Sequence, residues 1–104
     1  MRMMMKVTMD TEASNRAIAD GAMPGMLDQM ISELQPEAAY FGPEHGMRTA
    51  FIVFDLQDPS QLPPVSEPLF QTAKAKVEMF PVMNREDLKK GLAQIAGARA
   101  ATPA

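Results

Sequence analysis

The residues that decide the fold run from 36 to 56 and read Pro-Glu-Ala-Ala-Tyr-Phe-Gly-Pro-Glu-His-Gly-Met-Arg-Thr-Ala-Phe-Ile-Val-Phe-Asp-Leu. Two segments rich in aromatic and β-branched side chains flank a short centre, Gly42-Pro43-Glu44-His45-Gly46. Glycine reaches positive φ angles and proline presets a turn angle, so this centre is typical of a hairpin loop. The stretch therefore predicts two antiparallel strands joined by a loop over residues 42–46.

The second strand of this hairpin, residues 47–56, is apolar on both of its sides. Phe51 and Val53 lie on one side, whereas Ala50, Ile52, Phe54 and Leu56 lie on the other. A strand covered on only one side would alternate apolar with polar residues. We therefore expect a second cover, and the simplest cover in so short a chain is another copy of the same sheet.

Two elements are expected before the hairpin. Residues 2–9 alternate with period two, which predicts a half-buried strand. Residues 11–35 carry apolar side chains at helical spacing and are expected to form a helix. Two glycines and a proline interrupt this helix, so we expect a break between Gly21 and Pro24.

Three elements are expected after the hairpin. Prolines between residues 59 and 72 favour only short helical pieces there. Alternation returns over residues 74–83 and predicts a fourth strand. Asn84 is a good cap for a last helix, which Gly97 is expected to end. Residues 97–104 are expected to form a flexible tail.

The expected order is strand, helix, strand, strand, broken helix, strand, helix. This order predicts a ferredoxin-like α+β domain over residues 1–96: a βαββαβ unit with a four-stranded antiparallel sheet, plus a C-terminal helix. Both crossover helices cover the same face of such a sheet, and the other face is left bare. We therefore expect a homodimer that pairs through the bare face, with the last helix at the edge of the pair.

Composition excludes several classes of protein. The absence of cysteine excludes disulfides, thiolate metal sites and cysteine nucleophiles. The net charge of −3 and scattered basic residues argue against nucleic-acid binding. No segment approaches the roughly 20 apolar residues that span a bilayer, so we expect a cytoplasmic protein without a membrane partner. No spacing of metal ligands is present, and we expect neither a metal nor another cofactor.

The order of elements, the two-sided third strand and the sequence of residues 80–92 resemble the dimeric α+β barrel superfamily. Residues 36–41 and 67–70 are similar to small bacterial members that have no assigned function. The resemblance covers about residues 1–95 and implies two sheets that face each other in a homodimer. Its members include cofactor-free monooxygenases, muconolactone isomerases, haem-binding enzymes and transcriptional effector domains, so it leaves the activity open.

Three side chains of the hairpin are candidates for ligand binding. His45 is the only histidine, and we expect a turn residue in preference to a catalytic residue or ligand. Tyr40 is the only tyrosine and is expected in the core, with a place in a ligand pocket as the alternative. Arg48 is expected to pair with Glu37 across the hairpin, and the alternative is that it holds a substrate carboxylate.

Glu67 and Glu78 are the candidates for catalysis. Each lies among apolar neighbours, where a carboxylate costs energy unless it is paired. Burial in a pocket would make either group a candidate general base next to a substrate carbonyl. The alternative is that Glu67 lies on a helix surface and that Glu78 faces solvent or the rim of a dimer.

Three functions follow, and the sequence does not choose between them. The first is a homodimer that binds a small apolar or aromatic molecule between sheet and helices. The second is a cofactor-independent monooxygenase or isomerase, in which Tyr40, Glu67 or Glu78 positions a proton. The third is a structural interaction module. The ligand, the pathway and the presence of catalysis are not predicted.

Overall fold

The computed structural model describes residues 1–101, with side chains for residues 1–97. In this part the chain is an α+β structure with one sheet. Its elements in chain order are β1 (Arg2–Thr8), α1 (Thr11–Ala19), α2 (Ala22–Leu34), β2 (Ala38–Glu44), β3 (Met47–Asp55), the 3₁₀ turn η1 (Pro59–Gln61), α3 (Leu62–Ala73), β4 (Lys76–Pro81) and α4 (Arg85–Ala101).

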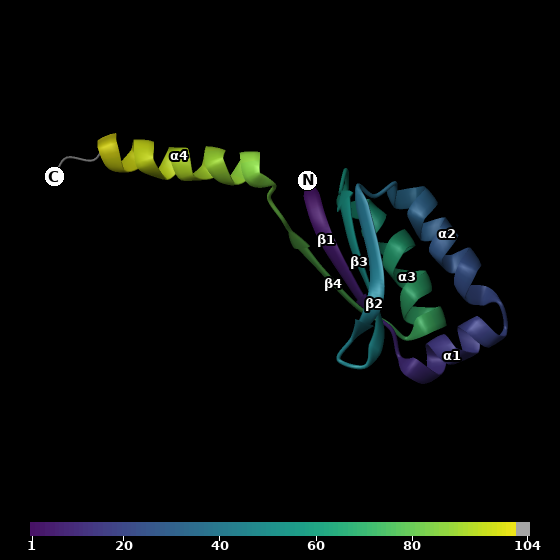
Figure 1. Cartoon of the computed structure of the whole chain (residues 1–104). Coiled ribbons are helices and arrows are strands. Elements are labelled where there is room, and N and C mark those ends of the chain that lie inside the picture. Colours follow the sequence, from purple (N-terminus) through teal and green to yellow (C-terminus); the bar gives the residue numbers. More distant parts are fainter. Residues whose placement is uncertain (102–104) are drawn as a thin grey trace.

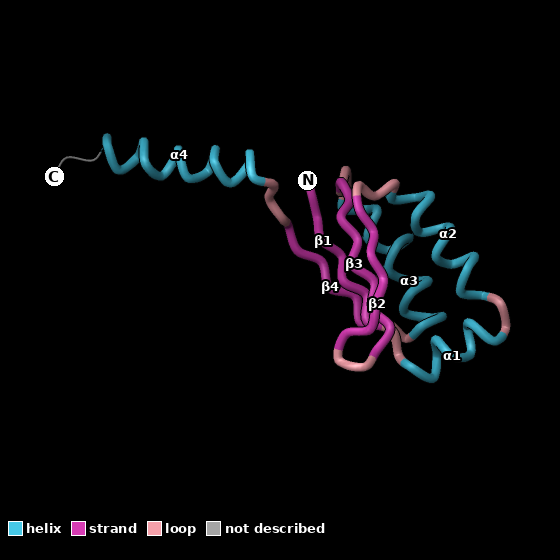
Figure 2. Tube along the Cα trace, viewed as in Figure 1, coloured by secondary structure: helices cyan, strands magenta, loops and turns pink. Residues whose placement is uncertain are grey.

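The four strands form an antiparallel sheet in the order β2-β3-β1-β4. Helices α1, α2 and α3 lie on one face of the sheet, and α4 projects away from it (Figure 1, Figure 2). The strand order is compatible with the ferredoxin-like arrangement expected from the sequence. The first crossover contains two helices, so the order is β-α-α-β-β-α-β-α instead of a plain βαββαβ with one added helix.

The break between α1 and α2 lies at the start of the expected interval. Gly21 has a φ of 80°, a left-handed conformation that ends α1 at little cost because glycine has no Cβ. Pro24 is accommodated in the first turn of α2, where its missing N–H removes no hydrogen bond within the helix. One helical pattern therefore becomes two helices that meet at an angle (Figure 1).

The hairpin is confirmed, but its turn is shorter than we expected. Only His45 and Gly46 lie outside the strands, with φ angles of 53° and 75°. Two consecutive positive φ angles are typical of the tightest hairpin turns. Gly42 and Pro43, which we expected in the loop, belong to β2. Pro43 is tolerated there because β2 is an edge strand, which needs hydrogen bonds on one side only.

The expectation of short helical pieces between residues 59 and 72 was wrong. Helix α3 runs without interruption from Leu62 to Ala73, although Pro68 lies inside it. Two further prolines fall in its first turn, where a proline removes no intrahelical hydrogen bond. The burial of Val65, Leu69 and Ala73 against the sheet offsets the hydrogen bond lost at Pro68.

The last helix begins where the sequence predicts. The backbone N–H of Asp87 donates to the side-chain oxygen of Asn84 at 2.8 Å, which satisfies one free N–H of the first turn. Gly97 does not end the helix, which continues to Ala101. The rest of the expected tail, residues 102–104, lies outside the described residues.

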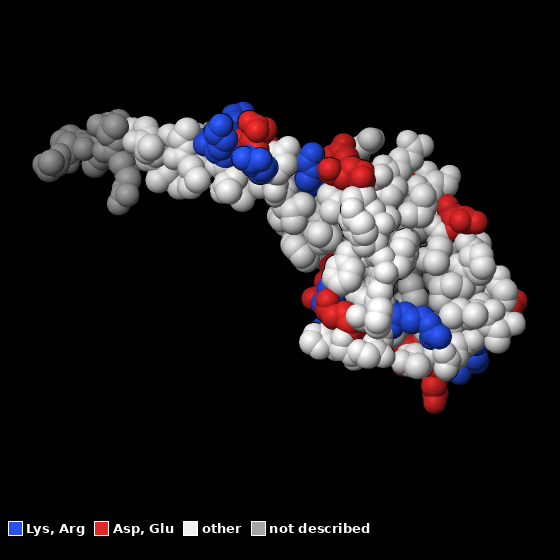
Figure 3. Space-filling model, in the orientation of Figure 1, with Lys and Arg blue, Asp and Glu red and all other residues white. Residues whose placement is uncertain are grey.

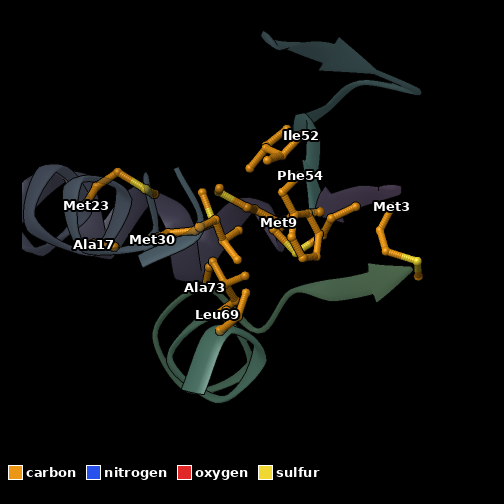
Figure 4. Close-up of a cluster of buried hydrophobic side chains, with 14 residues drawn as sticks. Met3, Met9, Ala17, Met23, Met30, Ile52, Phe54, Leu69 and Ala73 are labelled. Atoms are coloured by element: carbon orange, nitrogen blue, oxygen red, sulfur yellow. The ribbon is translucent and has the colours of Figure 1, made fainter. Parts of the chain in front are cut away.

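The core fills the space between the sheet and helices α1, α2 and α3 (Figure 4). Its largest fully buried side chains are Phe54, Met5, Ile52 and Leu69. The strand residues among them come from β1 and β3, where every second residue points toward the helices. Several of the methionines lie in this core, because their flexible side chains fill the irregular space between a sheet and angled helices. The buried methionines are Met3, Met5, Met9, Met23 and Met30.

Candidate functional site

A cavity of about 380 Å³ lies on the helix-covered side of the molecule, where α1 and α2 approach the β2–β3 hairpin. This volume is within the range of small-molecule sites, which is roughly 300 to 1,000 Å³. The lining residues are almost entirely apolar, and Arg48 and Thr49 are the polar residues among them. The lining residues are Met9, Ile18, Met23, Leu27, Phe41, Gly42, Pro43, Arg48 and Thr49.

Two large apolar side chains of this cavity remain uncovered. Phe41 is 54% exposed and Ile18 is 50% exposed, whereas Met9 and Met23 at the inner wall are almost completely buried. Phe41 belongs to the edge strand β2, and Ile18 lies in the last turn of α1, just before the break at Gly21. The helices thus do not cover the hairpin end of β2, and an apolar recess is left open there.

Arg48 is the charged group of this cavity. It lies near the start of β3, and its Nη1 atom donates hydrogen bonds to Ser14 Oγ at 2.7 Å and to Asn15 Oδ1 at 2.8 Å. The expected pair with Glu37 is not formed. Glu37 instead contacts Arg2, because β2 and β3 pair so that Arg48 lies opposite Pro43, far along the hairpin from Glu37.

The cations of the opposite, uncovered face have carboxylate partners. The side chain of Lys6 contacts Glu44, and this hydrogen bond raises the pKa of Lys6. Arg2 contacts Glu37 and also Asp87 at 3.3 Å, and the hydrogen bond that Arg2 donates to Glu37 raises the pKa of Arg2. Arg48 differs from both in that its two hydrogen-bond partners are neutral.

The other two hairpin candidates do not line the cavity. His45 lies at the tip of the hairpin with 89% of its side chain exposed, and its Nε2 atom is 3.8 Å from Glu44 Oε1. Tyr40 is 71% exposed and lies opposite Phe51 on the uncovered face of the sheet. The expectation that Tyr40 packs in the core is therefore wrong. Side chains of β2 alternate between the two faces of the sheet, and the side chain of Tyr40 lies on the uncovered face.

The two carboxylates considered for catalysis are exposed and lie apart. Glu67 is on the outer surface of α3, where Gln71 Nε2 approaches it at 3.5 Å. Glu78 is on the uncovered face of β4, with Lys76 Nζ at 3.9 Å. The burial that would make either group a general base is thus not found at either position, and neither lines the cavity.

Sequence reasoning identified Arg48 but missed the apolar residues around it. The sequence around Ile18 offers only weak evidence of a place in the cavity. Ile18 is the large apolar residue in an otherwise small and polar stretch, Asn15-Arg16-Ala17-Ile18-Ala19-Asp20. Phe41 was assigned only to a strand. No periodicity shows that these two residues, 23 positions apart in the sequence (41 − 18), share one cavity.

Within residues 1–101, no group of three or more His, Asp or Glu side chains is placed to hold a metal ion. Among the described helices, none has the length and apolar character required to cross a membrane. Comparison with known proteins gives no match to a family model, a curated protein or a solved structure.

Proposed function

We propose that this protein binds a small apolar molecule in the cavity between the β2–β3 hairpin and helices α1 and α2. The observation that carries the proposal is the pair of half-exposed side chains, Ile18 and Phe41, at a recess with an apolar inner wall. Apolar surface of this kind gains free energy when a ligand removes it from water, at about 25 cal/mol per Å². The lining offers no carboxyl or imidazole group for proton transfer, so we propose binding and not catalysis.

The experiment is a fluorescence titration with N-phenyl-1-naphthylamine, a neutral probe that brightens in apolar sites. We expect saturable binding by the wild type and at least about tenfold weaker binding by Phe41→Glu, because the ligand would then lie against a charge. Phe70→Glu is the matched control, since Phe70 is 42% exposed on α3 and does not line the cavity. Equal binding by all three proteins, or no saturation, would contradict the proposal.

We propose further that the chain forms a homodimer through the uncovered face of its sheet. Pairing between strands places four apolar residues in one row across this face: Ala38, Val53, Met4 and Phe80. The adjacent row begins with Tyr40 and Phe51 and ends with Lys6 and Glu78. The face carries both signs of charge, so two copies can meet without a large excess of like charges.

Helix α4 supports the same proposal. Its apolar residues Leu88, Leu92 and Ile95 share one helix face and are 46%, 55% and 58% exposed. Charged side chains gather at the start of α4, and the part that follows is uncharged up to the residues drawn in grey (Figure 3). A single helix of this length is marginally stable alone in water, so we expect its apolar face to pack against another surface.

The available area is of the order that a dimer needs. Four strands about 4.8 Å apart and about 23 Å long give the sheet a footprint of roughly 400 Å². Helix α4, about 25 Å long and about 10 Å wide, adds roughly 250 Å². The sum is about 650 Å², which lies within the roughly 600 to 1,000 Å² per partner that a standard stable interface buries. A second copy is therefore the partner we propose, with α4 at the edge of the pair.

A further inference from the structure

The hydrogen bonds of Arg48 leave part of its guanidinium group free. Both bonds to protein acceptors use the Nη1 atom, whereas Nε and Nη2 donate to no group of the described residues. Arg48 also forms no ion pair with a described carboxylate, in contrast to Arg2, which contacts two. A guanidinium group carries a full charge at every physiological pH, so Arg48 keeps both its charge and two donor atoms.

The position of this guanidinium group is fixed by helix α1. Ser14 is completely buried, and its Oγ lies 2.8 Å from the carbonyl oxygen of Asp10 and 3.2 Å from that of Thr11. The same hydroxyl accepts the bond from Arg48. Because Asp10 caps α1, the contact ties the start of β3 to the first turn of that helix. An arginine held in this way loses little further freedom when it binds a ligand.

We propose that the ligand of the cavity is a small amphipathic acid whose carboxylate binds Arg48 and whose apolar body lies against Phe41 and Ile18. This inference rests on the proposed function, because it uses the same cavity. The free Nε and Nη2 atoms form a planar pair of donors that matches the two oxygens of a carboxylate. A phosphate dianion is less suitable, since Arg48 is the single cation of the lining.

The experiment compares two probes of equal size on the full chain by isothermal titration calorimetry: 2-naphthoate and the neutral 2-naphthylmethanol. For the wild type we expect 2-naphthoate to bind at least about tenfold more tightly, because hydrogen bonds between charged groups are stronger than those between neutral ones. Arg48→Met is expected to abolish this preference, because methionine keeps an apolar side chain at this position and removes the donors that bind the carboxylate. Arg16→Met is the matched control, since Arg16 lies on α1 and does not line the cavity.

The outcomes separate this inference from the proposed function. Equal binding of both probes by the wild type would overturn the inference and leave the apolar site intact. Preference for 2-naphthoate that survives in Arg48→Met would also overturn it, because the acid would then bind elsewhere. No binding of either probe would contradict the proposed function itself. Arg48→Lys keeps the charge but loses the paired donors, and an intermediate preference in this variant supports the inference even if Arg48→Met does not fold.

Discussion

The two faces of the sheet are built from the same strands but have opposite environments. On the covered face, Met5, Ile52 and Phe54 are at most 1% exposed. On the other face, Phe51 and Val53 come from the same strand β3 yet are only partly buried, and Tyr40 on β2 is 71% exposed. Neighbouring residues of equal hydrophobicity therefore differ in burial because side chains alternate along a strand and only one face has helices.

This difference in burial indicates that the apolar residues of the two faces have different roles. Those of the covered face stabilise the single chain, since they are packed without needing another molecule. Those of the uncovered face gain little within one chain and become useful only when a second surface removes them from water. Substitutions on the two faces are thus expected to change different quantities: folding stability on one and self-association on the other.

The largest expected effect is on the covered face. Phe54→Ala removes a completely buried ring and leaves a cavity, so we expect the free energy of unfolding to fall by about 3 to 5 kcal/mol. Phe51→Ala is the matched control on the other face, where we expect a loss of about 1 kcal/mol. Urea denaturation in dilute solution measures both values. Equal losses for the two variants would mean that the faces do not differ as described.

The next effect concerns association through the uncovered face. Val53→Glu places a carboxylate in the middle of the apolar row, and we expect the dimer to dissociate at least about thirtyfold more readily because a central contact is lost. Leu92→Glu tests the contribution of α4 separately. Sedimentation velocity over a range of micromolar concentrations measures the dissociation constants, and Phe70→Glu controls for the added charge. A wild type that sediments as a monomer throughout this range would refute the dimer.

The strands and the break between α1 and α2 could be predicted because they depend on local signals. Alternation along residues 2–9 and 47–56 gives the strands, and the glycine at position 21 gives the break. Alternation also divides each strand into two faces. It does not tell which face the helices cover, which is why Tyr40 was expected in the core and is exposed instead.

The predictions for Pro68 and Arg48 were wrong because both depend on tertiary packing. A proline within a helix costs one hydrogen bond, and local reasoning cannot weigh this cost against the burial of α3 on the sheet. The partner of Arg48 depends on where the first turn of α1 lies relative to β3, which no spacing within the hairpin reveals. The cavity is set by the same packing of helices against an edge strand, and so its outline could not be predicted.

The smallest expected effect concerns the pair of Lys6 and Glu44 on the uncovered face, where Lys6 Nζ also lies 6.0 Å from the centre of the Phe51 ring. The hydrogen bond to Glu44 raises the pKa of Lys6 in the folded chain above its unfolded value of about 10.4. The pair therefore stabilises the fold fully below that pH, and its contribution disappears as the pH rises through the folded-state pKa.

Glu44→Gln should accordingly lower the urea midpoint at about pH 8, and the difference from the wild type should disappear as the pH rises through the raised folded-state pKa of Lys6. Glu67→Gln is the control, because Glu67 has no ion pair among the described residues and should show no such pH dependence. Both side chains of the pair keep about 30% of their surface exposed, with values of 27% and 31%. Solvent screening thus keeps the loss of stability in Glu44→Gln below that caused by substituting a buried residue of the opposite face. A difference in urea midpoint that does not change with pH would show that Glu44 acts through packing and not through its charge.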